Sequence, residues 1–230
     1  LTDVQEIRSV SFDTKGNARE QFIAIYSAID LVTGNADESS QLDFKRVINS
    51  EFDTAGNAHK VMIHKYRSSA FNEDGSIAII ASSYSDTRVM VTSEFYPRKN
   101  AKDQVSYSFY SATEEYDIAK IEDAMLAYNA SNKDDTAKGA FLTSTGLGVD
   151  QLGGKEHTVY TGAYTIHDKP TVRTAVTYTS GYQFIQKDVT TYDAYEERYG
   201  SFSKLTIDTY DRNDAFVERK KIDNTFGGEI

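Results

Sequence analysis

Four histidines are the residues of this chain best suited to metal binding or proton transfer: His59, His64, His157 and His167. His59 and His64 are five residues apart, which on a β-strand places their side chains on opposite faces. His157 and His167 could share a face of one long strand, but no carboxylate lies between them in the sequence. The zinc or acid–base interpretation is therefore weaker than the structural one, in which these are exposed strand residues near turns.

Acidic turns are the second group with possible chemistry, because Ca²⁺ takes about six to eight oxygen ligands. The best candidates are residues 72–76, which read Asn-Glu-Asp-Gly-Ser, and residues 208–214. Neither has the complete calcium-loop pattern with a distal Glu, and turn geometry alone explains Asp and Asn at such places. Calcium stays open as a cofactor, and the sequence identifies no other metal ligands.

Motifs of catalysis are missing from the sequence. The chain has no Cys, which removes disulfides, thiolate nucleophiles and Cys-based metal sites. It contains no G-x-S-x-G motif, P-loop or dinucleotide fingerprint. These observations predict a protein that is not an enzyme and has no catalytic or cofactor-binding residues. One alternative is a hydrolase whose site lies at the Gly-rich segment 132–155, since such segments can form lids.

Tyrosine and phenylalanine are abundant, with 16 Tyr and 12 Phe and no Trp. Both favour β-strands, and tyrosines exposed on a sheet face can stack on sugar rings. Tyr107, Phe109 and Tyr178 are examples that would suit a carbohydrate-binding module. Packing within a core or between strands is the more frequent use of such residues.

The formal net charge of -10 argues against nucleic acid as a partner, because phosphate backbones repel an acidic surface. No apolar run approaches the roughly 18 residues that a membrane helix needs, so we expect no membrane insertion. The lack of Cys fits a bacterial surface protein and equally a cytosolic one. The first residues, Leu1-Thr2-Asp3, and the last, 226–230, suggest a mature form or a piece of a longer protein.

An internal repeat is the main architectural signal. Residues 12–18, Phe-Asp-Thr-Lys-Gly-Asn-Ala, match residues 52–58, Phe-Asp-Thr-Ala-Gly-Asn-Ala, at an offset of 40. Asp early and Gly late in each copy predict a hairpin loop built on a type I turn, with positive φ at the Gly. A looser third copy has its turn at 96–99.

The C-terminal part continues this pattern. Strands are predicted at 172–178, 182–189 and 204–210, with a hairpin turn at 179–181 and another at 209–215. A further turn is predicted to begin at 190–193, and 168–170 marks one before these strands.

One segment has helical spacing. Its apolar residues are Ile118, Ile121, Met125 and Tyr128, which predict an amphipathic helix over about 114–130, capped by Ser111 or Thr113. After it, 132–155 is predicted to be a Gly-rich loop with one short strand near 141–145. The fold class is therefore mainly β: antiparallel β-hairpin repeats in an extended or sandwich-like sheet, with one inserted helix. We expect a single domain over 1–230, with 1–130 and 156–230 as an optional subdivision.

The two best turn copies resemble the Tyr-Asp repeats of bacterial Rhs-type surface proteins, which read Tyr-Asp-x-x-Gly-Asn between two hairpin strands. The matching residues are Phe12, Asp13, Gly16 and Asn17, and then Phe52, Asp53, Gly56 and Asn57. Tyr192-Asp193 and Tyr210-Asp211 match only the first two positions, and Phe replaces Tyr in the good copies. The resemblance implies a long, curling sheet used as a shell or surface scaffold.

Together these observations lead to the expectation of a non-enzymatic structural or adhesive component of a bacterial extracellular or cell-surface assembly. Its partners would be copies of itself or other surface proteins, because hairpin repeats leave sheet edges that can pair between subunits. Glycan binding is the first alternative.

Overall fold

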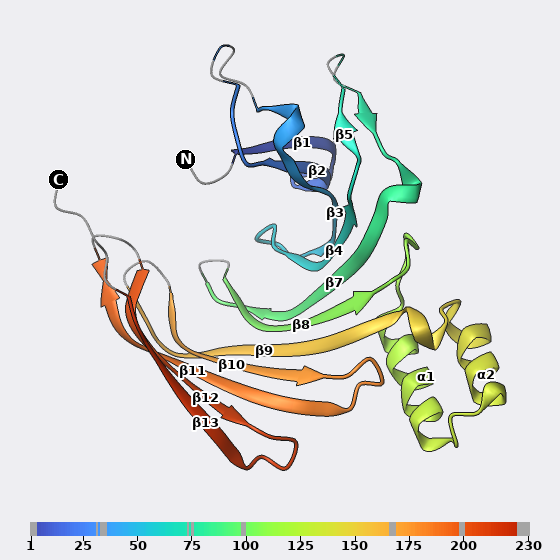
Figure 1. The fold of residues 1–230 in the computed structure, drawn as a ribbon, viewed down its shortest axis with the longest axis vertical. Helices are drawn as coiled ribbons and strands as arrows, with labels where there is room; N and C mark the ends of the chain where they lie inside the picture. The colour runs from blue at the N-terminus through green and yellow to red at the C-terminus, as the bar shows by residue number, and fades with distance from the viewer. Residues whose placement is uncertain are drawn as a thin grey trace. The chain divides into compact units, whose positions relative to one another are not determined.

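A single antiparallel sheet of eleven strands dominates the computed structural model, which confirms the mainly β prediction (Figure 1). The structure describes residues 4–30, 32, 36–72, 74, 76–97, 100–165, 169–197 and 201–224. The strand order is β1-β2-β3-β4-β7-β8-β9-β10-β11-β12-β13, so each strand lies beside its neighbour in the sequence, except that the small β5-β6 hairpin is set apart. Such a meander is what tandem hairpins produce.

The strands of the first half are β1 (Val4–Phe12), β2 (Ala18–Tyr26), β3 (Gln41–Phe52), β4 (Ala58–Tyr66), β5 (Ala70–Phe71), β6 (Ile77–Ala78), β7 (Tyr84–Phe95) and β8 (Ala101–Phe109). The helices are α1 (Ile118–Ala130) and α2 (Asp135–Thr145). The remaining strands are β9 (Leu152–Tyr164), β10 (Pro170–Tyr178), β11 (Phe184–Glu196), β12 (Ser201–Tyr210) and β13 (Phe216–Asp223). No helix in the described part of the chain combines the length and apolar character needed to cross a membrane.

The chain packs into two units. The first comprises residues 1–90 and 108–152, and the second comprises residues 91–107 and 153–230. The boundary passes through β7 and β8, so the middle hairpin tip belongs to the second unit. A division into 1–130 and 156–230 would instead assign that tip to the first unit.

The two predicted turn copies have the same geometry. In the first, the Asp13 amide donates to the Asn17 carbonyl at 2.9 Å and the Gly16 amide donates to the Asp13 carbonyl at 3.1 Å. In the second, Asp53, Gly56 and Asn57 make the same two bonds at 3.0 and 3.2 Å. The φ angles of the glycines are 86° and 82°, as the turn requires. The two matching sequence segments therefore form hairpin turns of the same geometry.

The turn recurs in the second unit without the Asp-Gly signature. The Thr179 amide donates to the Gln183 carbonyl, and Tyr182 takes the positive φ. The turn predicted at 179–181 therefore extends two residues further, to 183, and the positive φ is not at Gly181. The predicted turn at 209–215 is confirmed, with Asp211 in the position of Asp13 and Asp214 in that of Gly16.

Two other turn predictions have different outcomes. The turn predicted to begin at 190–193 is wrong, because these residues lie inside β11 and pair with β12. In this strand successive side chains of the Thr-Thr-Tyr-Asp sequence point to opposite faces of the sheet. Of the turns at 96–99 and 168–170, Arg98, Lys99 and Asp168 lie outside the described residues.

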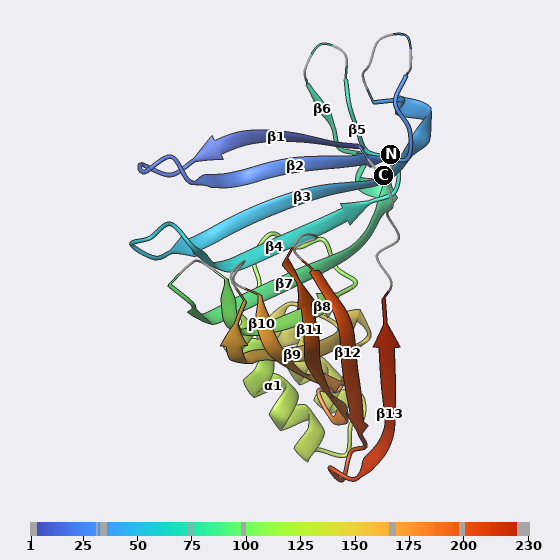
Figure 2. The ribbon, with the colours of Figure 1, turned by 90° about the vertical axis from the view of Figure 1, so that its left-hand side faces the viewer.

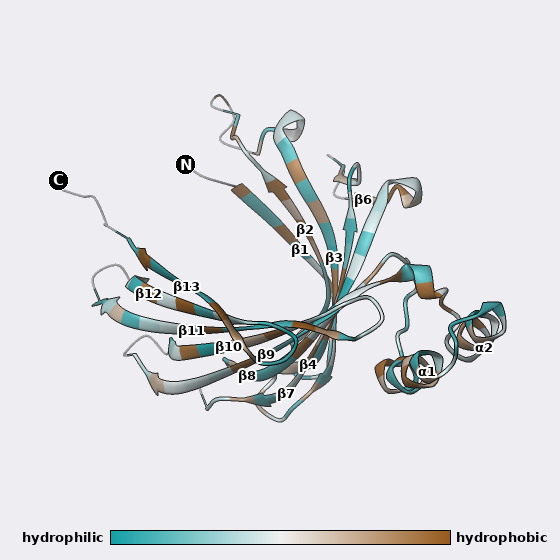
Figure 3. Cartoon of the chain, turned by 60° about the horizontal axis from the view of Figure 1, so that its bottom comes forward, coloured by the Kyte–Doolittle hydropathy of each residue, from teal (hydrophilic) through white to brown (hydrophobic). Residues whose placement is uncertain are grey.

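An aromatic core lies on one face of the first unit. Alternate residues of β2, β3 and β4 point to this face, where the β5-β6 hairpin packs over them. Phe44 is at the centre, with ring centroids 6.1 Å from Phe22 and 5.3 Å from Phe71. The full set of buried residues is Phe22, Ala24, Tyr26, Phe44, Tyr66 and Phe71. Polar and apolar positions alternate along much of β3 (Figure 3), whereas in the apolar second half of β2 buried positions alternate with half-buried ones.

The second unit has a different character, because the side chains that its described strands bury are mostly small. Its buried residues are Thr92, Tyr107, Thr158, Ala175, Thr190 and Ser203, of which Tyr107 alone is large. Aromatic rings pack in pairs along the sheet, as Tyr192 and Phe202 do at 4.5 Å. Cross-strand pairs therefore take the place of a deep core, and β13 is exposed along its whole length.

The predicted helix is present as α1, but it begins at Ile118 instead of near 114. Asp117 is the N-cap, and its carboxylate accepts from the Lys120 amide at 3.1 Å. Ser111 and Thr113 are therefore not the caps. The carbonyl of Ser111 accepts a bond from the Tyr116 hydroxyl, which ties this segment to the sheet and delays the start of the helix.

The prediction of a loop over 132–155 with a strand near 141–145 is wrong. Residues 135–145 form α2, and Leu152 already begins β9. The Asp134 carboxylate accepts from the Ala137 amide at 2.9 Å, and Gly146 ends the helix with φ of 75°. Phe141 packs on α1, and the two helices lie side by side (Figure 1). The Gly and Thr residues of this segment favour a loop, but the caps at Asp134 and Gly146 stabilise the helix at both ends.

Candidate functional site

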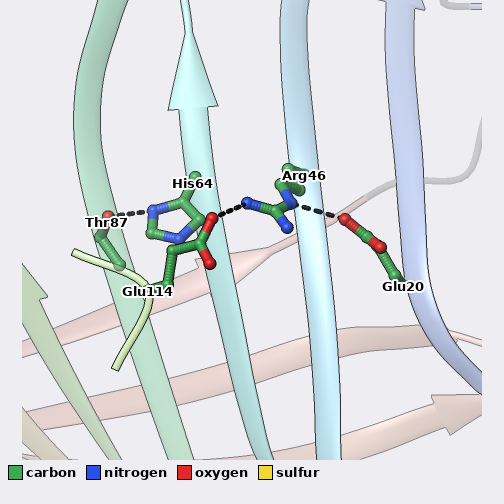
Figure 4. Close-up of polar contacts among 5 residues, drawn as sticks. All are labelled: Glu20, Arg46, His64, Thr87 and Glu114. Carbon is green, nitrogen blue, oxygen red and sulfur yellow. Dashed lines mark hydrogen bonds and ion pairs between the residues drawn. The ribbon is translucent and has the colours of Figure 1, made fainter. Parts of the chain in front are cut away.

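A group of interacting polar side chains, two of them buried, lies in the first unit, where β2, β3, β4 and β7 meet the segment that follows β8. Arg46 lies opposite Phe22 on one side and opposite His64 on the other, so all three share the face of the aromatic core. Glu114 reaches this face from the segment between β8 and α1 (Figure 4). We call Glu20, Arg46, His64, Thr87 and Glu114 the polar cluster.

Arg46 joins two carboxylates in the polar cluster. Its Nε lies 2.7 Å from Glu20 Oε1, and its Nη1 lies 2.9 Å from Glu114 Oε1. Burial alone would lower the pKa of Arg46, but the hydrogen bonds to Glu114 and Glu20 outweigh it and raise that pKa. The same hydrogen bond to Arg46 lowers the pKa of Glu114. Arg46 and Glu114 are therefore held in their charged forms, and both carboxylates are engaged by the one guanidinium.

His64 is only 1% exposed, and its Nδ1 lies 2.5 Å from the Thr87 hydroxyl. The Thr87 hydroxyl also lies 2.9 Å from the Ser111 carbonyl, so it connects the His64 ring to the segment that follows β8. The other ring nitrogen, Nε2, is buried without a hydrogen-bond partner. Burial and the nearby Arg46 charge lower the pKa of His64 to about 4, against a smaller opposing effect of Glu114. The imidazole is therefore neutral near pH 7.

The segment from Ser111 to Tyr116 covers this histidine. The Tyr116 ring stacks on Phe109 with centroids 4.3 Å apart, and Lys60 Nζ donates to the Tyr116 carbonyl at 2.7 Å. Burial raises the pKa of Tyr84 to about 12 although its hydroxyl bonds to Thr87. The polar cluster thus holds the segment from Ser111 to Tyr116 on the sheet. The hydroxyls of Thr87, Tyr84 and Tyr116 all form hydrogen bonds there.

A groove of about 520 Å³ opens beside the polar cluster, between the first two hairpin turns. Glu20 and Arg46 contribute to its wall, together with turn residues such as Asp13 and Asp53. The carboxylate of Asp13 accepts from the side-chain and backbone amides of Asn17, and that of Asp53 from those of Asn57, which lowers the pKa of both carboxyl groups. Four charged groups of the groove, Asp13, Asp53, Glu20 and Arg46, are thus paired within the fold itself.

The predicted histidines do not form a site together. His64 is buried, so the expectation of an exposed strand histidine is wrong for it, because the even-numbered side chains of β4 face the core. His157 Nε2 lies 2.9 Å from Asp103 Oδ1 of β8, a carboxylate that sequence spacing alone did not bring near. His59 lies on β4 with its Nε2 3.9 Å from an Asp53 oxygen, and His167 is outside the described residues.

The candidate calcium turns use their carboxylates internally. Asp74 Oδ1 accepts from the amide and the hydroxyl of Ser76, and Asp211 Oδ1 accepts from two amides of its turn. Asp208 forms a two-pronged ion pair with Arg219 at 2.6 and 2.7 Å. Across the described residues, no three His, Asp or Glu side chains gather as a metal-ligand set. Calcium binding stays a prediction, since Glu73 and Gly75 of the first turn are not described.

The structure also places the tyrosines that the sequence suggested for sugar binding and the segment that it suggested for a hydrolase site. Tyr107 and Phe109 are buried, and Lys155 Nζ lies 5.4 to 5.8 Å from the rings of Tyr107, Tyr178 and Tyr182. The hydrolase site was expected in residues 132–155, which form α2 and the start of β9. A cavity of about 310 Å³ lies there between α1 and α2, and it is lined by Ala, Ser, Phe141 and Tyr128 without a carboxylate.

The comparisons with known proteins add no relative: no protein-family model matches the chain, and no curated protein matches its sequence.

Proposed function

We propose that this protein is a non-enzymatic structural component that associates with copies of itself. The observation that carries the proposal is the open sheet. The strands at its two ends, β1 and β13, each have one neighbour among the described residues, and both carry exposed apolar side chains. An unpaired strand edge presents amide and carbonyl groups to another chain.

The character of the second unit supports the same proposal. Apart from Tyr107, the buried side chains of its described strands are small, and the aromatic residues of β11 and β12 are half-buried on the sheet. A scaffold strengthened by cross-strand pairs needs no deep cavity. The polar cluster of the first unit supports it too, because its charges fasten segments of the chain to one another.

The repeated turn supports a scaffold of the kind that the Tyr-Asp repeat resemblance implies. Seven hairpin turns in the described part of the chain, opened by residues 13, 53, 72, 96, 165, 179 and 211, share the bond from the amide of the first residue to the carbonyl of the fifth. Side-chain oxygens of Asp13, Asp53, Thr165, Thr179 and Asp211 accept from the amide four residues later. We accordingly propose an extracellular or cell-surface location in a bacterium.

Light scattering over a wide concentration range tests the proposal. The molar mass should rise above that of a 25.7 kDa monomer as the concentration increases. A particle that stays monomeric at millimolar concentration would remove the proposed function. The same measurement after addition of chelator shows whether calcium contributes.

A further inference from the structure

The sequence of strand β1 is complementary to itself when two copies of the strand lie antiparallel. From Val4 to Val10 the order is Val-Gln-Glu-Ile-Arg-Ser-Val, with Ile7 at the centre. When two such strands run antiparallel about Ile7, Glu6 of each lies opposite Arg8 of the other, Gln5 lies opposite Ser9, and Ile7 lies opposite its own copy. Both charges on each strand thereby meet the opposite sign.

The exposed state of this edge fits such a partner. Strand β1 lies beside β2 at one end of the sheet (Figure 2). Its Ile7 is 54% exposed and pairs with Ile23, on the face away from the aromatic core. Glu6 and Arg8 both face the other side and already pair along the strand at 2.7 Å, with partly exposed side chains. A second copy would turn this pair into a ring of four alternating charges and would cover the isoleucine.

The charges also fix the register. Moving the two-fold centre by one residue places Glu6 opposite Glu6 or Arg8 opposite Arg8, and like charges directly opposite each other are unfavourable. The pairing with β2 shifts between Ser9 and Ser11, which leaves Val10 as a bulge and limits the regular edge to residues 4–9. The symmetric register centred on Ile7 uses this regular segment.

The other open edge does not have this property. Strand β13 carries Arg219, Lys220 and Lys221 in succession. A two-fold centre on any of the three places at least one cation opposite another cation, and lysines on an edge strand oppose pairing between chains. The two edges therefore differ in what they can bind.

We propose that two copies of this chain associate through β1, antiparallel and centred on Ile7, to give a two-fold dimer. This inference rests on the proposed self-association and names its contact. A two-fold interface is closed, so the β1 contact by itself yields a dimer and no longer chain. Backbone hydrogen bonds between the two β1 strands join the sheets of the two copies.

Charge exchange tests the pairing. E6R places two cations on β1, and R8E places two anions there. Each variant alone should associate at least about tenfold more weakly than the original protein in sedimentation experiments, whereas an equimolar mixture should form mixed dimers with restored affinity. The matched control is E218R on β13, which should leave the dimer unchanged.

Arg8 lies 4.1 Å from the Phe71 ring, so circular dichroism and thermal unfolding accompany each variant. If R8E fails to fold, I7K gives an independent readout, because two opposed lysines should weaken the dimer without touching the core. If the original protein associates but E6R and I7K associate equally well, the β1 contact is wrong and the proposed function survives. If the original protein stays monomeric, both are wrong.

Discussion

At the scale of single residues, the two hairpin turns offer a matched comparison. Gly16 and Gly56 have nearly the same φ, but a Cβ on Gly16 would have open space, whereas one on Gly56 would lie 2.6 Å from Asn17 Oδ1 of the neighbouring turn. The second turn thus packs against the first. Gly16→Ala should destabilise the fold by about 1 kcal/mol through backbone strain, and Gly56→Ala by roughly twice as much.

Urea unfolding of both variants measures this difference. The larger effect at Gly56 has a second source, because Asn17 must move and its Nδ2 then loses the 2.8 Å bond to Asp13. Equal destabilisation of the two variants would mean that the turns do not touch.

His64 gives the fold a dependence on pH. Its pKa is about 4 in the folded protein and 6.5 ordinarily, so the unfolded chain binds more protons between these values. The stability that the neutral imidazole brings is complete above pH 6.5 and is lost as the pH falls to about 4. The urea midpoint should drop over this range, and the drop should be smaller in His64→Gln. A variant with the same pH profile as the original protein would contradict the buried, neutral histidine.

The sequence predicts residue roles well where chemistry is local. Asp13 and Asp53 bond amides within five residues of themselves, and their turns were predicted from this pattern alone. The polar cluster was not predicted, because Arg46 and Glu114 are 68 residues apart and only the path of the segment after β8 brings them together. A buried histidine in an alternating strand, His64 between Met62 and Tyr66, was the one available signal.

At the scale of elements, strands were easier to predict than helix ends. The alternation of side chains with a period of two predicts β12 well, because this pattern can be recognised in the local sequence without knowing which strand pairs with it. Helix α2 was missed because Gly139 and three Thr residues lower its propensity. Its stability comes from caps and from the packing of Phe141 on α1, and this packing cannot be read from local sequence.

The caps of α2 provide a test of that explanation. Asp134→Ala removes the bond to the Ala137 amide and should destabilise the helix by about 1 kcal/mol. Hydrogen exchange should then speed up at the amides of residues 137–142 while the strand amides keep their rates. Unchanged exchange in this helix would show that the cap contributes little.

At the scale of the whole molecule, the hairpin signals in the sequence account for the eleven-strand meander. The meander leaves two edge strands, β1 and β13, which differ in their charges and therefore in what they can bind. The sequence predicted edges that pair between subunits. It did not reveal which edge would serve, since that required knowing that β1 and not an inner strand ends the sheet. Only then does the symmetry of residues 4–10 become a statement about assembly.

A single introduced cysteine tests the central claim most directly, because the chain has none of its own. In Ile7→Cys, antiparallel pairing about residue 7 brings the two Cα atoms to about 4.5–5.5 Å, within reach of a disulfide. Mild oxidation of dilute protein should yield a covalent dimer rapidly, whereas Leu126→Cys, exposed on α1, should react slowly. Equal rates for the two variants, or no dimer from Ile7→Cys, would contradict the β1 pairing.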